Sequence, residues 1–292
     1  MSVILYIILY IISTIFHINI LSILLHDKKN DIYIYCLYII YSTKHNYIKM
    51  EIPLDILKII SSYLVKPTMK LLDWIDINKL DMRELSRNYN AIHLLEANLD
   101  KIDWMWLSLN PSAIHLLLAH PENIDWMWLS RNPNAIHLLE ANQDKIIWSW
   151  LSINPNAMNL LLSHPDKISW DNLSMNASAI HLLKANPDKI NWKGLSYNSC
   201  NEGMKLLEQN IDKIDWKWLS YNSNAIHLLL AHPEKIDWKW LSGNCNAMHI
   251  LEQNMDKIDW ETLSCNPSIF EIDKYKYNKD ILDKSRVLDS II

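Results

Sequence analysis

Glycine is the residue that this chain most clearly lacks. The 292 residues include only three glycines, Gly194, Gly203 and Gly243, whereas globular proteins average about 7%. Because the three lie far apart, the sequence has neither a glycine-rich phosphate loop nor a dinucleotide-binding fingerprint. It has no Gly-x-Ser-x-Gly nucleophile elbow, and tight two-residue hairpins, which favour glycine, are not expected. The scarcity excludes the most familiar nucleotide-using enzymes.

The chain also lacks an excess of basic residues and a metal-binding cysteine motif. It has 28 Lys and Arg against 33 Asp and Glu, a net charge of −5, whereas a nucleic-acid binder needs a basic surface. The four cysteines have no Cys-x-x-Cys spacing, so we interpret them as reduced thiols of an intracellular protein. Histidines and aspartates recur once per repeat instead of forming one asymmetric cluster. We therefore expect no enzymatic activity, no metal and no cofactor.

An internal repeat dominates what is present. The pattern Leu-Ser-x-Asn recurs nine times, from Ser86 to Ser264, with a spacing of 22 residues that becomes 24 once. The extra residues fall near Cys200–Glu202, which we interpret as a loop. A tryptophan column follows the same period, and we interpret it as the structural repeat core because each Trp buries about 150–250 Å². Its members are Trp104, Trp126, Trp148, Trp170, Trp192, Trp216, Trp238 and Trp260.

Each unit is expected to be a pair of short helices. The residue before the Trp, such as Asp103, has an N-cap type in seven of eight units. A second start follows at Asn110-Pro111, and the unit ends at Asn or His, where Asn can take the left-handed conformation of the missing glycine. A leucine-rich repeat has a similar period, but Met105 and Ser112 occupy two of its apolar positions. The sequence predicts an all-α fold, an α-solenoid of about eight to nine helix-pair repeats of 22 residues with a helical N-terminal cap.

Two columns vary from unit to unit, and variation is typical of exposed positions. One directly follows the tryptophan column, and the other is the x of Leu-Ser-x-Asn. Exposed, varied columns often form the recognition face of a solenoid, so we predict a protein-binding face here; neutral solvent exposure is the alternative. An RNA-binding helical array is a further alternative, disfavoured by the acidic balance. The candidate partner-binding residues are Arg131, Lys193, Tyr197, Lys217, Tyr221 and Lys239.

A different motif precedes the repeat. Residues 50–64 form an amphipathic pattern that resembles the first helix of an F-box, although residues 70–85 fit the later F-box helices poorly. The resemblance implies docking on the adaptor subunit of a cullin-based ubiquitin ligase, with the repeats holding a substrate. A helical cap that seals the first unit is the alternative. The adaptor-binding candidates are Ile52, Pro53, Leu54, Ile56, Leu57, Ile60 and Leu64.

The repeat as a whole resembles repeat proteins of large DNA viruses with AT-rich genomes. That resemblance covers residues 50 to about 273 and rests on the 22-residue unit and its Ile, Asn, Lys and Tyr bias. It implies a viral substrate receptor that redirects host ubiquitination from the host cytoplasm. The substrate, the oligomeric state and the binding face are not specified by the sequence.

The first 49 residues allow two interpretations. Ser2 to Leu25 contains no Asp, Glu, Lys or Arg and is long enough to span a bilayer, which would make the protein a membrane-anchored scaffold. Alternatively, translation starts at Met50, directly before the F-box-like pattern. The expected organisation is an apolar segment at 1–49, a capping region at 50–87, eight repeats at 88–265, and a C-terminal cap and tail at 266–292.

Overall fold

The computed structural model describes residues 54–291, and these divide into two compact parts. One part, residues 69–271, contains all the repeats. The other part includes residues 54–68 together with the C-terminal residues 272–291. The two parts meet at 68/69 and 271/272, so residues 69–87 of the expected capping region and residues 266–271 of the expected tail lie with the repeats. The possible membrane segment and Met50 lie outside the described residues.

The first helix of each unit is short, and an N-cap starts most of them. The Asp103 side chain accepts a hydrogen bond from the Trp106 backbone N–H at 3.1 Å, as predicted. Asp81 begins an additional helix that lies before the predicted repeats, with Met82 at the Trp position. The first helices are α5 (Met82–Ser86), α7 (Trp104–Leu109), α9 (Trp126–Arg131), α11 (Trp148–Leu151), α13 (Trp170–Leu173), α15 (Trp192–Tyr197), α17 (Trp216–Tyr221), α19 (Trp238–Ser242) and α21 (Trp260–Ser264).

The second helix follows a tight turn. These helices are α6 (Ile92–Glu96), α8 (Ile114–Ala119), α10 (Ile136–Ala141), α12 (Met158–Ser163), α14 (Ile180–Ala185), α16 (Asn201–Glu208), α18 (Ile226–Ala231) and α20 (Met248–Glu252). The 24-residue spacing does not create a loop: it lengthens α16 to eight residues and replaces the turn before it. The terminal Asn142 has φ −135°, so the expectation of a left-handed cap is also wrong.

Single turns of 3₁₀-helix join these helices. Those before a second helix are η2 (Tyr89–Ala91), η5 (Pro133–Ala135), η8 (Ala177–Ala179) and η11 (Ser223–Ala225), and η14 (Pro267–Ile269) occupies the same place after α21. Those before a first helix are η1 (Ile77–Lys79), η3 (Leu99–Lys101), η4 (Pro121–Asn123), η6 (Gln143–Lys145), η7 (Pro165–Lys167), η9 (Pro187–Lys189), η10 (Ile211–Lys213), η12 (Pro233–Lys235) and η13 (Met255–Lys257).

A buried asparagine in every unit carries the contact between neighbouring units. Asn154 is fully buried, and its Nδ2 donates to the Ser130 carbonyl at 3.1 Å and the Asn132 carbonyl at 2.8 Å in the preceding unit. Its Oδ1 accepts from the Asn156 N–H at 3.0 Å and so starts the next turn. A buried amide needs all these partners, and this explains why the Asn recurs in all nine Leu-Ser-x-Asn patterns.

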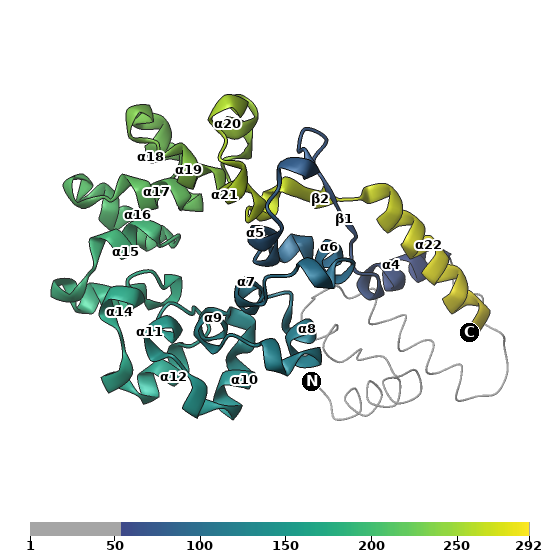
Figure 1. Cartoon of the computed structure of the whole chain (residues 1–292), viewed down its shortest axis with the longest axis horizontal. Helices are drawn as coiled ribbons and strands as arrows, with labels where there is room; N and C mark the ends of the chain where they lie inside the picture. Colours follow the sequence, from purple (N-terminus) through teal and green to yellow (C-terminus); the bar gives the residue numbers. More distant parts are fainter. Residues whose placement is uncertain (1–53, 292) are drawn as a thin grey trace. The chain divides into compact units, whose positions relative to one another are not determined.

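The repeats close into a ring. Asn88 is the first of the buried asparagines, and it donates to the carbonyls of Ser264 and Asn266 at 3.0 and 2.9 Å. The buried asparagine of each other unit donates in the same way to the unit before it. The Asp81 N–H likewise donates to the Ser264 hydroxyl at 2.8 Å, as Asp103 N–H does to Ser86 at 3.0 Å. Residues 69–271 thus form a cycle of nine units, with the first helices inside and the second helices outside (Figure 1).

The two ends of the repeat region build the ninth unit together. The C-terminal side supplies η14 and β2 (Phe270–Ile272), and the N-terminal side supplies β1 (Met69–Leu71) and η1. The strands are antiparallel, with Leu72 N–H bonded to Ile269 C=O at 2.9 Å and Lys70 paired with Glu271 at 2.9 Å. This strand pair replaces a second helix, so neither end of the array needs the terminal caps that the sequence predicted.

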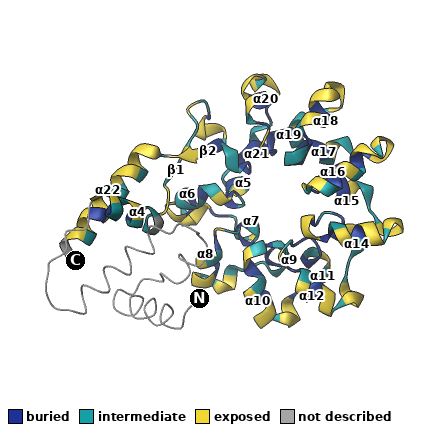
Figure 2. Cartoon of the chain, turned by 180° about the vertical axis from the view of Figure 1, so that it is seen from behind, coloured by how far each residue is buried: buried dark blue, intermediate teal, exposed yellow. Residues whose placement is uncertain are grey.

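The core of the ring consists of leucine and alanine columns. Leu107, Ala113 and Leu117 are fully buried, and the same positions are fully buried in almost every other unit. The tryptophans pack against this core but stay half-buried. Figure 2 shows the exposed residues gathered on the outer helices. The burial of a continuous core by units that are each too thin to fold alone is typical of a solenoid.

The other part pairs two helices. In it α4 (Leu54–Leu64) packs along α22 (Lys274–Ile291), and the Tyr277 hydroxyl donates to the Ser62 carbonyl at 3.1 Å. No further F-box helix follows α4 among the described residues, because residues 69–86 form β1, η1 and α5 of the ring. The cap expected at 50–87 is thus divided between the two parts.

Candidate interaction surfaces

The x column of Leu-Ser-x-Asn faces the inside of the ring. Ile153, Gly243 and Cys265 are buried, and Arg131, Tyr197 and Tyr221 are half-buried. The expectation that this column is exposed is therefore wrong. Side chains of this column from different units contact one another inside the ring.

These interior side chains form one connected chain of contacts. Arg131 Nη2 on α9 donates to the Tyr197 hydroxyl on α15 at 2.8 Å, although two units lie between these helices in the sequence. Tyr197 stacks on Tyr221 with centroids 5.4 Å apart, and the Tyr221 hydroxyl lies 3.8 Å from Cys265 Sγ. Arg87 Nη2 completes the chain, 2.9 Å from the same sulfur. Three predicted binding residues thus have a packing role.

Burial disfavours the charged forms of the groups at the end of this chain. Burial raises the pKa of the Cys265 thiol, and the nearby Arg87 guanidinium only partly opposes it. Burial likewise raises the pKa of Tyr221 well above its ordinary value. Arg87 pairs with Glu84 at 2.7 Å and lies 4.8 Å from the Trp106 ring centroid. A thiol held protonated is a poor nucleophile, so this cluster gives no support to an active site.

The other varied column is exposed, as predicted. It contains Arg83, Met105, Met127, Ser149, Asp171, Lys193, Lys217, Lys239 and Glu261, of which only Met127 is half-buried. Lys193, Lys217 and Lys239 lie on the consecutive helices α15, α17 and α19, which pack side by side. We call these three residues the lysine arc. The structure brings together the three predicted lysines. Trp218 contacts both Lys193 and Tyr197. Trp240 likewise contacts both Lys217 and Tyr221.

Each member of the tryptophan column is covered by a histidine or lysine side chain. Where the second helix ends in His, that ring packs on the Trp: His120, His164 and His232 lie with centroids 4.8–5.0 Å from Trp104, Trp148 and Trp216. The other five are covered by lysine Nζ at 4.3–4.7 Å, namely Trp126, Trp170, Trp192, Trp238 and Trp260. This covering supports a structural role for the column, as the sequence predicted.

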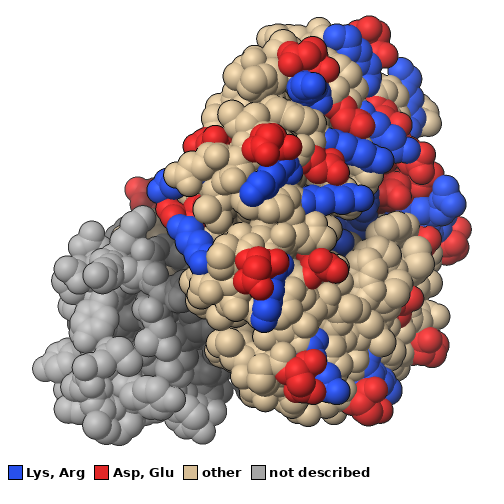
Figure 3. Space-filling model, turned by 90° about the vertical axis from the view of Figure 1, so that its left-hand side faces the viewer, with Lys and Arg blue, Asp and Glu red and all other residues tan. Residues whose placement is uncertain are grey.

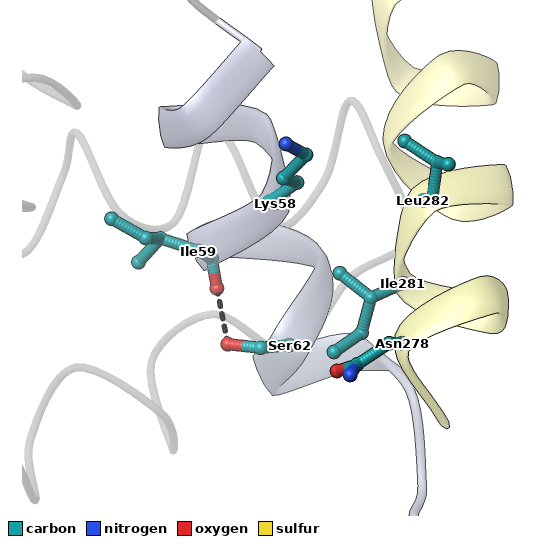
Figure 4. Close-up of a pocket in the computed structure, with 6 residues that line it drawn as sticks. All are labelled: Lys58, Ile59, Ser62, Asn278, Ile281 and Leu282. Carbon is teal, nitrogen blue, oxygen red and sulfur yellow. Dashed lines mark hydrogen bonds between the residues drawn. The ribbon is translucent and has the colours of Figure 1, made fainter. Parts of the chain in front are cut away.

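The F-box-like residues of α4 divide between two environments. Leu57 is 1% exposed, whereas Leu54 is 45% exposed, and Ile56, Ile60 and Leu64 are half-buried. Ile52 and Pro53 lie outside the described residues. An open pocket of about 470 Å³ lies between α4 and α22 (Figure 4), and it is lined by Lys58, Ile59, Ser62, Asn278, Ile281 and Leu282. Leu54 does not line this pocket, and its exposed side chain offers a separate apolar surface for docking.

Other kinds of site find no support in residues 54–291. No group of three or more His, Cys, Asp or Glu side chains in this range is placed to hold a metal ion. No helix in this range is both long enough and apolar enough to cross a membrane. On the face of the molecule in Figure 3, basic and acidic side chains lie interleaved instead of forming a continuous basic surface.

Comparison with known proteins gives no further guidance. No family model matches the chain, and no curated protein or solved structure is similar to it.

Proposed function

We propose that this protein is a non-enzymatic scaffold for protein partners. The observation that carries the proposal is that the residue type varies from unit to unit at one exposed position of the ring. The hydrogen-bonded Ser and Asn positions are identical in all nine units, whereas the exposed column on the first helices changes from methionine to aspartate to lysine. A rigid ring with one variable exposed column is the design that repeat proteins use for recognition.

The finer proposal is that α4 docks the adaptor subunit of a cullin-based ubiquitin ligase. It is supported by the F-box-like pattern and by the exposure of Leu54, and a large apolar side chain at a helix surface is a common anchor for a partner. The ring would then hold the substrate. The resemblance to viral repeat proteins makes this a viral receptor that acts on host ubiquitination.

Direct titration of the purified full chain with the recombinant adaptor subunit tests this role. We expect measurable binding, weakened at least about tenfold by Leu54→Asp, because a carboxylate cannot enter an apolar site without a large desolvation cost. Leu118→Asp is the matched control, since Leu118 on α8 is 54% exposed and the substitution is the same. Biolayer interferometry measures both variants.

Two results would contradict the adaptor role. One is the absence of adaptor binding to the wild-type chain, and the other is an equal loss of binding in the two variants. The broader scaffold role is tested by quantitative capture from host-cell extract, in which we expect partners whose recovery depends on the ring. If the full chain recovers nothing above an inert bead control, the scaffold role is wrong.

A further inference from the structure

We infer that the lysine arc binds a short acidic peptide segment of a partner protein. This inference rests on the proposed scaffold function and specifies its partner chemistry. Its starting point is that Lys193, Lys217 and Lys239 are exposed and belong to three consecutive units. The salt bridges of the described residues use other lysines, such as Lys184 with Glu202, so the charges of the arc are not neutralised within the ring.

Tryptophans of the neighbouring units hold two of these lysines in place. Lys193 Nζ lies 5.7 Å from the Trp218 ring centroid, and Lys217 Nζ lies 5.4 Å from that of Trp240. An ammonium group over an indole face is stabilised by a cation–π interaction. Because binding then immobilises a side chain that is already ordered, the entropy cost of recruiting each lysine is reduced.

The size of the arc fits a short segment. Packed helices lie about 8–10 Å apart, so three lysines on consecutive helices span about 20 Å. An extended peptide rises about 3.3 Å per residue, and five to seven residues, roughly, cover that length. Carboxylates at about every third residue would match the lysine spacing.

The ends of the arc favour a peptide over a nucleic acid. Asp171 precedes Lys193 in the same column, and Glu261 follows Lys239, so an acidic side chain bounds the arc on each side. A polynucleotide that continued past three lysines would meet both carboxylates, whereas a peptide can end or become neutral there. The net charge of −5 acts in the same direction.

A pair of charge-matched triple variants tests the inference in the full chain. The arc variant is Lys193→Glu, Lys217→Glu and Lys239→Glu. The control is Lys145→Glu, Lys189→Glu and Lys257→Glu, which changes the net charge equally at three lysines that also lie over tryptophans, but over the first tryptophan column. Circular dichroism checks that both variants keep the wild-type helix content.

Fluorescence anisotropy with a fluorescein-labelled hexaglutamate peptide gives the readout at low salt, and a hexaglutamine peptide and a twelve-residue thymidine oligonucleotide serve as comparison probes. We expect hexaglutamate binding that the arc variant weakens at least about tenfold and the control at most about twofold. Hexaglutamine should not bind, and the oligonucleotide should bind more weakly than hexaglutamate.

Three results would overturn the inference: no hexaglutamate binding to the wild-type chain, equal weakening by both triple variants, or tighter binding of the oligonucleotide at the arc. These failures are separate from failure of the proposed adaptor role. Adaptor binding that survives in the arc variant while peptide binding is absent removes only this inference. Loss of adaptor binding with intact peptide binding removes only the adaptor role.

Discussion

A single glycine shows how tightly the interior of the ring is packed. A Cβ atom at Gly243 would clash with Cε2 of the Tyr221 ring and would lie 2.9 Å from Cδ2 of the same ring. Contacts below 3.0 Å force one of the groups to move, and the Tyr221 ring is held by its contacts with the rings of Tyr197 and Trp240. Glycine is therefore required at position 243, because the Tyr221 ring occupies the space that a side chain would need.

The first prediction concerns this contact. Gly243→Ala should lower the free energy of unfolding by about 1–3 kcal/mol, the usual cost of overpacking a core. The same substitution in a Tyr221→Leu background should cost less, since the ring that it meets is gone. Urea denaturation of the four proteins in this double-mutant cycle measures the coupling. Equal costs in the two backgrounds would show that Tyr221 is not the group that the alanine meets.

Tyr221 also predicts a pH dependence. Because burial raises its pKa in the folded state, the unfolded chain loses this proton near pH 10 while the folded chain keeps it. The folded state then binds more protons, so stability is fully present below about pH 10 and falls as the pH rises above it. Tyr221→Phe should flatten this slope by up to about 1.4 kcal/mol per pH unit. Unfolding by urea between pH 8 and 11 measures it, and an unchanged slope would contradict the assignment.

At the scale of the element, α11 lacks the capping hydrogen bond that seven of the nine first helices have. Ile147 occupies the N-cap position of α11 with extended backbone angles and 42% exposure, and its side chain makes no capping hydrogen bond. In α9, Asp125 at the equivalent place accepts from the Trp128 N–H at 3.1 Å. The backbone of α11 is thus already arranged for a residue that it does not have.

Ile147→Asp should therefore stabilise the protein by about 1 kcal/mol. The gain comes from satisfying a backbone N–H at the start of α11 and from a negative charge near the helix N-terminus. Ile147→Ala is the control, since it removes the same apolar side chain without supplying an acceptor. Thermal unfolding of both variants separates the cap from the loss of isoleucine, and an aspartate that is no more stable than the alanine would contradict the prediction.

At the scale of the whole molecule, closure makes the first unit equivalent to an internal one. Asn88 and Asn154 are both fully buried, and each donates two hydrogen bonds to the unit before it. In an open array, the first asparagine would have no preceding unit. The equivalence can be tested by making the same substitution at Asn88 and at Asn154.

Asn88→Ala and Asn154→Ala should each lower the free energy of unfolding by about 3 kcal/mol. Each leaves two buried carbonyls and one N–H without this partner, and an unsatisfied buried group costs about 1–3 kcal/mol. Asn156→Ala, at an exposed position in the same turn, should cost less than about 1 kcal/mol. Chemical denaturation of the three variants checks this. A small effect at Asn88 alone would indicate an open array in solution.

The sequence predicts the local structure well because local chemistry determines it. The cap at Asp103, for example, depends only on residues within one helical turn of it. Closure could not be predicted in the same way, since Asp81 meets Ser264 across 183 residues. Met82 also replaces the tryptophan that would have marked the first helix, and the ninth unit has a strand pair in place of its second helix.

The candidate surface was predicted in part for a related reason. Variation identified the lysine arc correctly as exposed, because solvent constrains its side chains little. The same reasoning is wrong for Tyr197 and Tyr221, where variation reflects a fit between units on different sides of the ring. A single unit of sequence carries no information about what faces it across the interior, and only closure brings those residues together.

Closure also restricts how the gene that encodes this protein can change. An open solenoid gains or loses a repeat by recombination and simply becomes longer or shorter. Here the rotation between neighbours, about 40° for nine units around a full circle, has to sum to one turn. A duplicated or deleted repeat would leave the two half-units at the seam out of register, so Leu85, Asn88 and Ser264 would lose their neighbours together. Repeat number, which is the freely varying quantity in most repeat proteins, becomes a fixed property of this one.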